Sequence, residues 1–353
     1  MLLGNARETA SDWVRQNVRH WPGFIGAFYS GSTVGLPDSA VLAPTSDVDI
    51  NVVTTGSAAV TGVGKIYRDD VVLEVSSVPL SEISTPEQVL GNYHRAGSLR
   101  MDSIICDPTG RLRHLQQQVA ASFADRRWIR QRCRNARDRV TSHLGRFDPA
   151  GPWHDQVTAW LFGTGVTTHV ILVAALRNPT VRLRYLAARE ALAEYGYTAF
   201  YGDLLDLLGC ANLSAERAAF HLRGLAATFD TAAAAARTLF PFSHDITAST
   251  RRIAIDGSDA LIRQGDQREA VFWMIATYAR CHKILAADAP RHVQQSLMPA
   301  FNDLLDEMGI TGSKDLLARC DAVVLALPSI AAKAEEIIEC NPEAFDSAPL
   351  PRG

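Results

Sequence analysis

Two aspartates in the first fifty residues have the type and spacing of metal ligands. Asp47 and Asp49 lie in the segment DVDINVV (47–53), where charged and apolar residues alternate before the segment becomes fully apolar. Side chains two residues apart on a strand leave the same face, so this pattern predicts a strand that carries both carboxylates together. Adjacent carboxylates repel each other unless a cation lies between them. Because hard oxygen ligands suit Mg²⁺, we expect Asp47 and Asp49 to bind this ion.

A glycine and a serine upstream have the pattern of a phosphate-binding turn. The short apolar run from Phe24 to Tyr29 is followed by Ser30-Gly31-Ser32, which predicts a strand that ends in a turn into a short helix. Backbone N–H groups at such a turn point outward and can hold a phosphate. Gly31 would let the backbone approach a ligand closely, and Ser32 adds a hydroxyl donor. Gly31 and Ser32 are therefore candidate nucleotide-binding residues.

A third carboxylate lies in a second β-rich segment. Glu74 interrupts the apolar run VVLEVSSV (71–78), where a solvated charge would be unexpected, and the β-branched content predicts a β element over 66–78. Beside strand 47–53, Glu74 could ligate metal, act as a general base on an attacking hydroxyl, or pair structurally with Arg68. Arg68 itself could reach a phosphate, although a surface ion pair with its acidic neighbours is the more ordinary role.

The composition of the chain changes after Gly110. From Arg111 onward Ala, Leu and Arg dominate, and apolar residues recur with helical periodicity as far as residue 340. Beyond residue 146 the sequence predicts helices at 154–177, 181–195, 199–208, 214–238, 245–263, 267–287, 291–308 and 313–340. A length of 353 residues suits two domains. We therefore expect an α+β fold, with a mixed sheet in a small α/β domain over residues 1–110 and an all-helical domain over 111–345. A loose tail is expected over 346–353.

Arginines are concentrated at the start of the predicted helical domain. Residues 111–146 carry ten Arg and two Asp, and the sequence predicts a basic helix there. This helix could favour a triphosphate, tRNA or another polyanion. Its arginines would be spread around several faces, so a solvated helix that pairs with acidic residues of the helical domain is the favoured interpretation. The net charge of −3 also makes nucleic acid an unfavoured partner for the whole chain.

Cysteine usage and hydropathy indicate the compartment. The six cysteines have no CxxC spacing and no accompanying His cluster, which argues against a disulfide framework or a zinc site and favours a reducing compartment. The first residues lack the apolar region and cleavage site of a secretory signal. The apolar run from Val166 to Leu176 is too short to span a bilayer. We therefore expect a cytoplasmic protein with no membrane partner.

Taken together, these motifs resemble those of the DNA polymerase β-like nucleotidyltransferase superfamily. That pattern begins with an apolar residue, then Gly, then either Gly or Ser. After a spacer it continues with Asp, an apolar residue, either Asp or Glu, and another apolar residue. Here Gly31-Ser32 are followed by Asp47-Val48-Asp49-Ile50, after a spacer of fourteen residues that is longer than usual. The run LEVSSV is similar to the third-carboxylate strand of aminoglycoside nucleotidyltransferases, which combine such a domain with a helical C-terminal domain.

The resemblance implies a chemistry and a set of roles. Asp47 and Asp49, with help from Glu74, would hold Mg²⁺ and through it a nucleoside triphosphate. Ser32 and nearby amides would hold the β- and γ-phosphates, and Glu74 would take the proton of the acceptor hydroxyl. The expected reaction transfers AMP from ATP to an aminoglycoside-like small molecule and releases pyrophosphate, as antibiotic-resistance enzymes do. Nucleotide transfer to a protein or tRNA, and nucleotide sensing without turnover, remain open alternatives.

Overall fold

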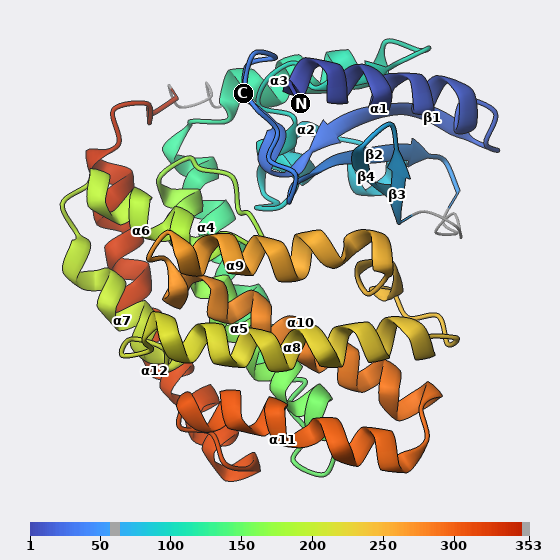
Figure 1. Cartoon of the computed structure of the whole chain (residues 1–353). Coiled ribbons are helices and arrows are strands. Elements are labelled where there is room, and N and C mark those ends of the chain that lie inside the picture. The colour runs from blue at the N-terminus through green and yellow to red at the C-terminus, as the bar shows by residue number, and fades with distance from the viewer. Residues whose placement is uncertain (57–63, 348–353) are drawn as a thin grey trace. The chain divides into compact units, whose positions relative to one another are not determined.

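The chain forms two compact units in the computed structural model, which describes residues 1–56 and 64–347. The first unit combines Met1–Ala136, Val170–Thr180 and the C-terminal segment from Ala331. The second combines Arg137–His169 and Val181–Ile330. A mixed sheet with helices occupies the N-terminal region and is followed by a largely helical region (Figure 1), so the predicted α+β class is confirmed.

The first unit contains a five-stranded sheet with the strand order β3-β4-β2-β1-β5. The central strand β2 (Asp47–Thr54) runs parallel to β4 (Val71–Pro79) and antiparallel to β1 (Phe24–Ser30). The edge strands β3 (Lys65–Arg68) and β5 (Ile104–Cys106) are antiparallel to β4 and β1 respectively. The predicted strand at 47–53 is therefore the middle of the sheet, where both neighbours fix its register.

Two strands occupy the region 66–78, for which the sequence predicts one β element. β3 and β4 form a hairpin in which Arg68 pairs with Val71. The two connecting residues, Asp69 and Asp70, have φ angles of 48° and 64°. Two left-handed residues in succession build a turn whose twist matches the flanking strands, and Asp is among the residues that tolerate this conformation.

Helices cover both faces of this sheet (Figure 1). On one face α1 (Leu3–Asn17) packs against a core that includes Val48, Ile50, Leu73 and Val75. On the other face a second core joins Phe28, Val53 and Val78 of the sheet to two helices, α2 (Pro86–Leu90) and α3 (Arg111–Ser122). Short 3₁₀ turns lie at Leu80–Glu82 and Ala96–Ser98. Because strand side chains alternate, residues that flank Val48 and Leu73 point away from α1.

The basic segment 111–146 forms two helices rather than the single helix predicted. α3 ends at Ser122, and α4 (Arg126–Leu144) begins after Asp125. The Asp125 side chain is buried, and its Oδ1 accepts a hydrogen bond from the backbone N–H of Arg127 at 2.8 Å. Aspartate is a strong helix N-cap, so this residue explains why a new helix begins here.

Several arginines of α4 are used within the first unit. Arg130 donates from Nε to Glu335 Oε1 at 2.8 Å and also pairs with Glu339, while Arg126 pairs with Asp346 at 3.0 Å. The buried Arg132 donates to two backbone carbonyls, those of Leu90 and Phe123. The interpretation that the basic segment pairs with acidic residues of the predicted helical domain is confirmed for Arg130, through Glu335 and Glu339. Asp346, the partner of Arg126, lies in the predicted tail.

The second unit is helical. In the segment 245–263, for which the sequence predicts one helix, a short 3₁₀ turn at Ala248–Thr250 follows one at Ser243–Asp245. The helix itself begins only at Arg251, as a π-helical segment (Arg252–Asp256) that continues into α9 (Gly257–Arg263). The other helices match the predicted ones to within a few residues, and α5 and α12 continue into the first unit. These helices are α5 (Trp153–Ala174), α6 (Arg184–Glu194), α7 (Thr198–Leu208), α8 (Ala215–Ala235), α10 (Gln267–Asp288), α11 (Arg291–Glu307) and α12 (Ser313–Cys340).

The units divide the chain differently from the boundary predicted at residue 110. α3 and most of α4 belong to the first unit because α3 contributes Leu112, Leu115 and Val119 to the second core of the sheet. The residues from Ala331 onward belong there as well. Of the tail predicted over 346–353, the described residues include only Asp346 and Ser347.

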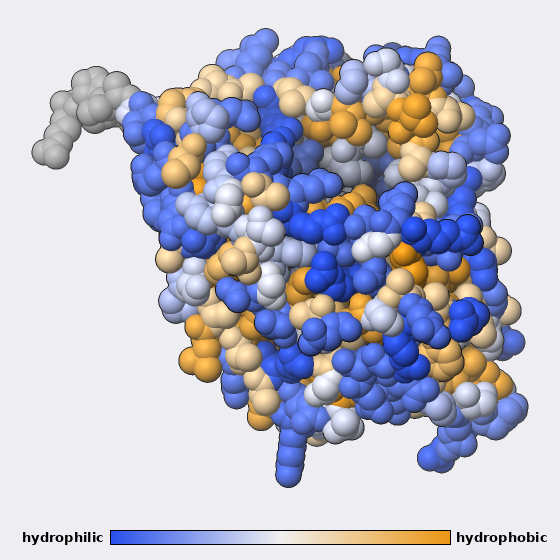
Figure 2. Space-filling view, turned by 60° about the vertical axis from the view of Figure 1, so that its left-hand side comes forward, coloured by the Kyte–Doolittle hydropathy of each residue, from blue (hydrophilic) through white to orange (hydrophobic). Residues whose placement is uncertain are grey.

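Apolar residues of the long helices are used mainly as core. Among the described helices, α5 alone is long and apolar enough to cross a membrane by composition, but 89% of its most apolar window is buried inside the protein. Figure 2 shows one face of the surface, where hydrophilic residues predominate and apolar residues form separate groups. α5 is therefore a core helix.

Candidate functional site

Strand register brings the three predicted carboxylates together. In the parallel pair of β2 and β4, Asp49 lies opposite Glu74, and Asp47 lies two residues earlier on the same face of β2. One carboxylate oxygen of each residue lies within 4.8 Å of those of the other two. Val48 and Leu73 point into the α1 core on the opposite face, which fixes the direction of the three acidic side chains.

The predicted turn lies directly beside this cluster. β1 ends at Ser30, which pairs with Asp49 across the sheet, and a short 3₁₀ turn follows over Gly31–Thr33. Gly31 has a φ of 70°, and a Cβ at this position would overlap the Asp49 carboxylate, with Cγ only 2.5 Å away. Ser32 is exposed. Glycine is therefore required at 31 both by the left-handed backbone and by the close approach of the turn to Asp49.

A residue far along the chain supports the turn. Asn178 belongs to the segment Val170–Thr180 of the first unit, and its Nδ2 donates to the carbonyls of Gly31 at 3.3 Å and Val34 at 3.4 Å. Arg100 attaches the same segment by donating to the carbonyl of Leu176 at 2.6 Å. Sequence reasoning missed Asn178, because no local pattern connects it to a turn 147 residues away.

A lysine that sequence reasoning also missed pairs with two of the three carboxylates. Lys65 on β3 lies opposite Glu74 on β4, and its Nζ forms ion pairs with Asp47 Oδ2 and with Glu74 Oε2, the latter at 2.5 Å. Only 7% of the Lys65 side chain is exposed. The sequence signal that could have found Lys65 is the Asp69-Asp70 turn, because a two-residue turn there fixes the hairpin register that places residue 65 opposite residue 74.

Burial and repulsion act on the two aspartates. Burial raises the pKa of Asp49 well above its usual range, and the nearby charges of Asp47 and Glu74 raise it further. Burial also raises the pKa of Asp47, while the positive charge of Lys65 opposes this shift. The cluster therefore holds its negative charge at a cost, which a bound cation would reduce.

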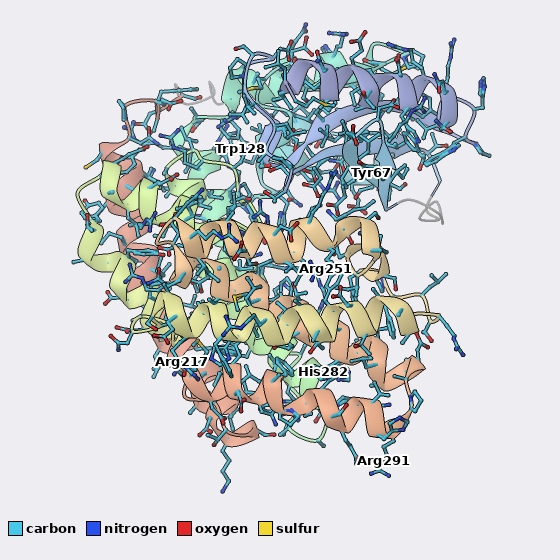
Figure 3. The ribbon with its side chains drawn as sticks, in the orientation of Figure 1. Tyr67, Trp128, Arg217, Arg251, His282 and Arg291 are labelled. Atoms are coloured by element: carbon cyan, nitrogen blue, oxygen red, sulfur yellow. The ribbon has the colours of Figure 1, made fainter. Side chains whose placement is uncertain are left out.

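Arg68, the remaining predicted site residue, is not brought to the cluster. On β3, Ile66 packs against the α1 core, and Arg68, two residues later, points to the same face of the sheet. Lys65 and Tyr67 point to the opposite face, which carries the three carboxylates (Tyr67 is labelled in Figure 3). Arg68 Nη2 donates to Gln16 Oε1 at 2.9 Å, and its Nε lies 3.6 Å from Asp69 Oδ2. The structure thus places Arg68 in surface contacts, the more ordinary of the two roles considered.

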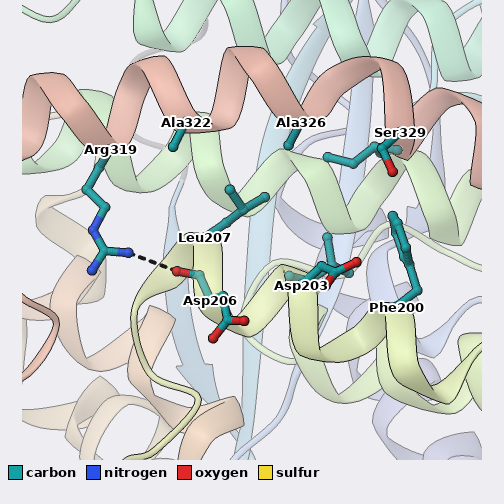
Figure 4. Close-up of a pocket in the computed structure, with 10 residues that line it drawn as sticks. Phe200, Asp203, Asp206, Leu207, Arg319, Ala322, Ala326 and Ser329 are labelled. Atoms are coloured by element: carbon teal, nitrogen blue, oxygen red, sulfur yellow. Dashed lines mark hydrogen bonds between the residues drawn. The ribbon is translucent and has the colours of Figure 1, made fainter.

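The second unit contains a groove of about 390 Å³ between α7 and α12 (Figure 4). Its walls are mostly apolar, with Phe200, Leu204 and Ile330 among the lining residues. Arg319 on its rim donates to the backbone carbonyl of Asp206 at 2.8 Å and so is engaged in holding the helices together. Among the described residues, the groove's carboxylates Asp203 and Asp206 belong to no group of three possible metal ligands, so the carboxylate cluster remains the candidate site.

Comparison with models of known protein families and with curated proteins finds no match for this chain. Three carboxylates in reach of one another are hard oxygen ligands, which is the set that Mg²⁺ prefers. They lie beside the 3₁₀ turn Gly31–Thr33, where the sequence predicts phosphate binding, so the residues present fit such an ion.

Proposed function

We propose that this protein is a Mg²⁺-dependent nucleotidyltransferase. It would transfer a nucleoside monophosphate, AMP from ATP, to a hydroxyl of an aminoglycoside-like small molecule and release pyrophosphate. The observation that carries the proposal is the convergence of Asp47, Asp49 and Glu74 on one sheet face, beside the turn at Gly31. The motif resemblance to the polymerase β-like superfamily supports the same chemistry, and fold alone would not.

Asp47 and Asp49 are the residues that would hold Mg²⁺, with Glu74 as a third ligand or as a neighbour of the ion. When bound, Mg²⁺ would supply positive charge to the triphosphate and to the pyrophosphate leaving group. The two aspartates are fixed for this role because β2 is the central strand, flanked by β1 and β4.

The turn would bind the phosphates. The first N–H groups of a helical turn have no partner within it, and Gly31 brings this backbone against Asp49. Ser32 is exposed and can add its hydroxyl as a donor. Asn178 holds the carbonyls of Gly31 and Val34, which favours a fixed orientation of the N–H groups on the other side of the turn.

Glu74 would act on the acceptor. The acceptor oxygen forms a bond to the α-phosphorus while the bond from that phosphorus to the β-phosphate oxygen breaks, and the hydroxyl proton passes to a Glu74 carboxylate oxygen. The Glu74 side chain is 29% exposed, so an acceptor can approach it. β4 fixes its direction, since Leu73 and Val75 on either side are buried against α1.

The test is pyrophosphate release from nucleoside triphosphates presented with a library of hydroxyl acceptors. We expect Asp47→Asn to lower turnover by several orders of magnitude while the far-ultraviolet circular dichroism stays unchanged. Asp102→Asn is the matched control, because Asp102 belongs to the same unit but pairs with Arg113 on the surface. Near-normal turnover of Asp47→Asn would sink the assignment.

A further inference from the structure

Lys65 has a position that the proposed chemistry does not explain. Its ammonium contacts Asp47 Oδ2 and Glu74 Oε2, two of the carboxylate groups that would ligate metal. We propose that Lys65 makes metal binding depend on the nucleotide, because its ammonium holds these oxygens until a triphosphate offers it another anionic partner. This inference rests on the proposed nucleotidyl transfer and assigns a further residue to that site.

The ammonium and a divalent ion compete for the same atoms. The Lys65 ammonium donates to Asp47 Oδ2 and to Glu74 Oε2, and a metal bound to these two oxygens needs their lone pairs as well. The two cations also repel each other at this separation. Divalent metal therefore binds these oxygens only when the Lys65 ammonium moves away from them.

Lys65 can move, but it needs a new partner. Its backbone is fixed by pairing with β4 opposite Glu74, whereas its charge lies at the end of a flexible four-carbon stem. The side chain is 7% exposed, so leaving the carboxylates for a site without an anion would strand a buried charge. A triphosphate bound at the Gly31 turn, beside Asp49, supplies phosphate oxygens within the same part of the site.

The consequence is positive coupling between metal and nucleotide. Metal binding releases Lys65, and nucleotide binding stabilises the released ammonium, so each raises the affinity for the other by the same factor. Free divalent metal would bind weakly, and the metal–nucleotide complex tightly. Replacing Lys65 with a neutral residue removes the ammonium that competes for Asp47 Oδ2 and Glu74 Oε2, which strengthens binding of free metal and removes most of the coupling.

Mn²⁺ is a suitable probe because its electron paramagnetic resonance signal reports free ion directly. Mn²⁺ would be titrated into the full chain with and without α,β-methylene-ATP, which cannot be cleaved at the α-phosphorus, and binding of Mn²⁺ to the analogue alone would be measured separately. For the wild type we expect the analogue to tighten Mn²⁺ binding about tenfold or more, within the usual range of coupling between sites. Lys65→Met should bind Mn²⁺ about tenfold more tightly without the analogue and gain little from it.

Lys333→Met is the matched control, because it removes the same charge from the same unit at a lysine that pairs with Glu336 on α12. Lys65→Gln, which keeps a hydrogen-bond donor, is the second variant should Lys65→Met fold poorly, and it should show the same gain in Mn²⁺ affinity.

Three results would overturn the inference. Equal Mn²⁺ affinity of the wild type with and without the analogue would do so without any variant. Wild-type affinity of Lys65→Met without the analogue would remove the role of Lys65 and leave the proposed function standing. No Mn²⁺ binding by either protein under any condition would remove both.

Discussion

Glu74 has surroundings that bear on each of its possible roles. Its Oε2 is held by Lys65, and 29% of the side chain is exposed, so part of the carboxylate can meet an acceptor hydroxyl. The third role, structural pairing with Arg68, is not the observed one, because Arg68 contacts Gln16 and Asp69 instead. Metal ligation and general-base action are the two chemical roles that remain, and one substitution separates them from each other and from a purely structural role.

Glu74→Gln keeps the size of the side chain and removes its basicity. If Glu74 is the base, turnover should fall by about 10²–10⁴-fold, the usual range for a positioned base, while Mn²⁺ and nucleotide bind nearly as in the wild type. Steady-state pyrophosphate release and an Mn²⁺ titration on the same preparation check this. Glu82→Gln, at an exposed carboxylate that pairs with Arg95, is the control.

Two other outcomes would give Glu74 a different role. Loss of Mn²⁺ affinity in proportion to the loss of rate would make it a metal ligand instead of the base. A lower melting temperature with unchanged rate and affinity would make it structural.

At the scale of elements, the turn after β1 positions the site through one glycine. Gly31 combines a φ of 70° with a contact in which any Cβ would overlap the Asp49 carboxylate. Gly110, at the start of α3, has a similar φ of 72°, but a Cβ there would meet nothing within 4 Å. A substitution at Gly110 therefore measures the cost of the left-handed backbone alone, whereas the same substitution at Gly31 adds the cost of displacing Asp49.

Gly31→Ala and Gly110→Ala should each lose about 1 kcal/mol of stability from the left-handed backbone. We expect only Gly31→Ala to weaken nucleotide binding in the presence of Mn²⁺, because only there must Asp49 or the turn shift. Urea unfolding measures the first effect, and calorimetric titration with α,β-methylene-ATP the second. Unchanged nucleotide affinity of Gly31→Ala would separate the turn from the site.

Some features of the site have a local signal in the sequence, and others do not. Alternation over 47–53 and the apolar neighbours of Glu74 are local signals, so the strands and the directions of these side chains were predictable. Lys65 required the β3–β4 hairpin to be recognised, and its Asp-Asp turn is an uncommon one. Asn178 reaches Gly31 across 147 residues, and such a contact depends on tertiary structure that local periodicity does not contain.

The first unit is assembled from three separate stretches of chain. A change of composition at residue 110 predicts where β structure ends, but it does not predict which helices pack on the sheet. α3 belongs to the sheet through its buried apolar face, and the end of α12 belongs to the same unit, with Arg130 of α4 paired to Glu335 and Glu339. The stability of the first unit, which carries the three carboxylates, therefore depends on residues of α12 that lie more than two hundred positions after the sheet.

Ile337 provides a test of this dependence. It is fully buried in the part of α12 that belongs to the first unit, whereas Leu325, on the same helix, is 80% exposed. Ile337→Ala should lower the free energy of unfolding by about 2–5 kcal/mol, as large-to-small substitutions in a core do, and Leu325→Ala should stay within about 0.5 kcal/mol of the wild type.

The loss of stability should appear in the sheet, so the amides of β2 and β4 should exchange with deuterium at least about tenfold faster in Ile337→Ala. Hydrogen-exchange mass spectrometry of peptides covering 47–54 and 71–79 measures this directly. Faster exchange confined to helices of the second unit, with β2 and β4 unchanged, would show that the end of α12 does not stabilise the unit that carries Asp47, Asp49 and Glu74.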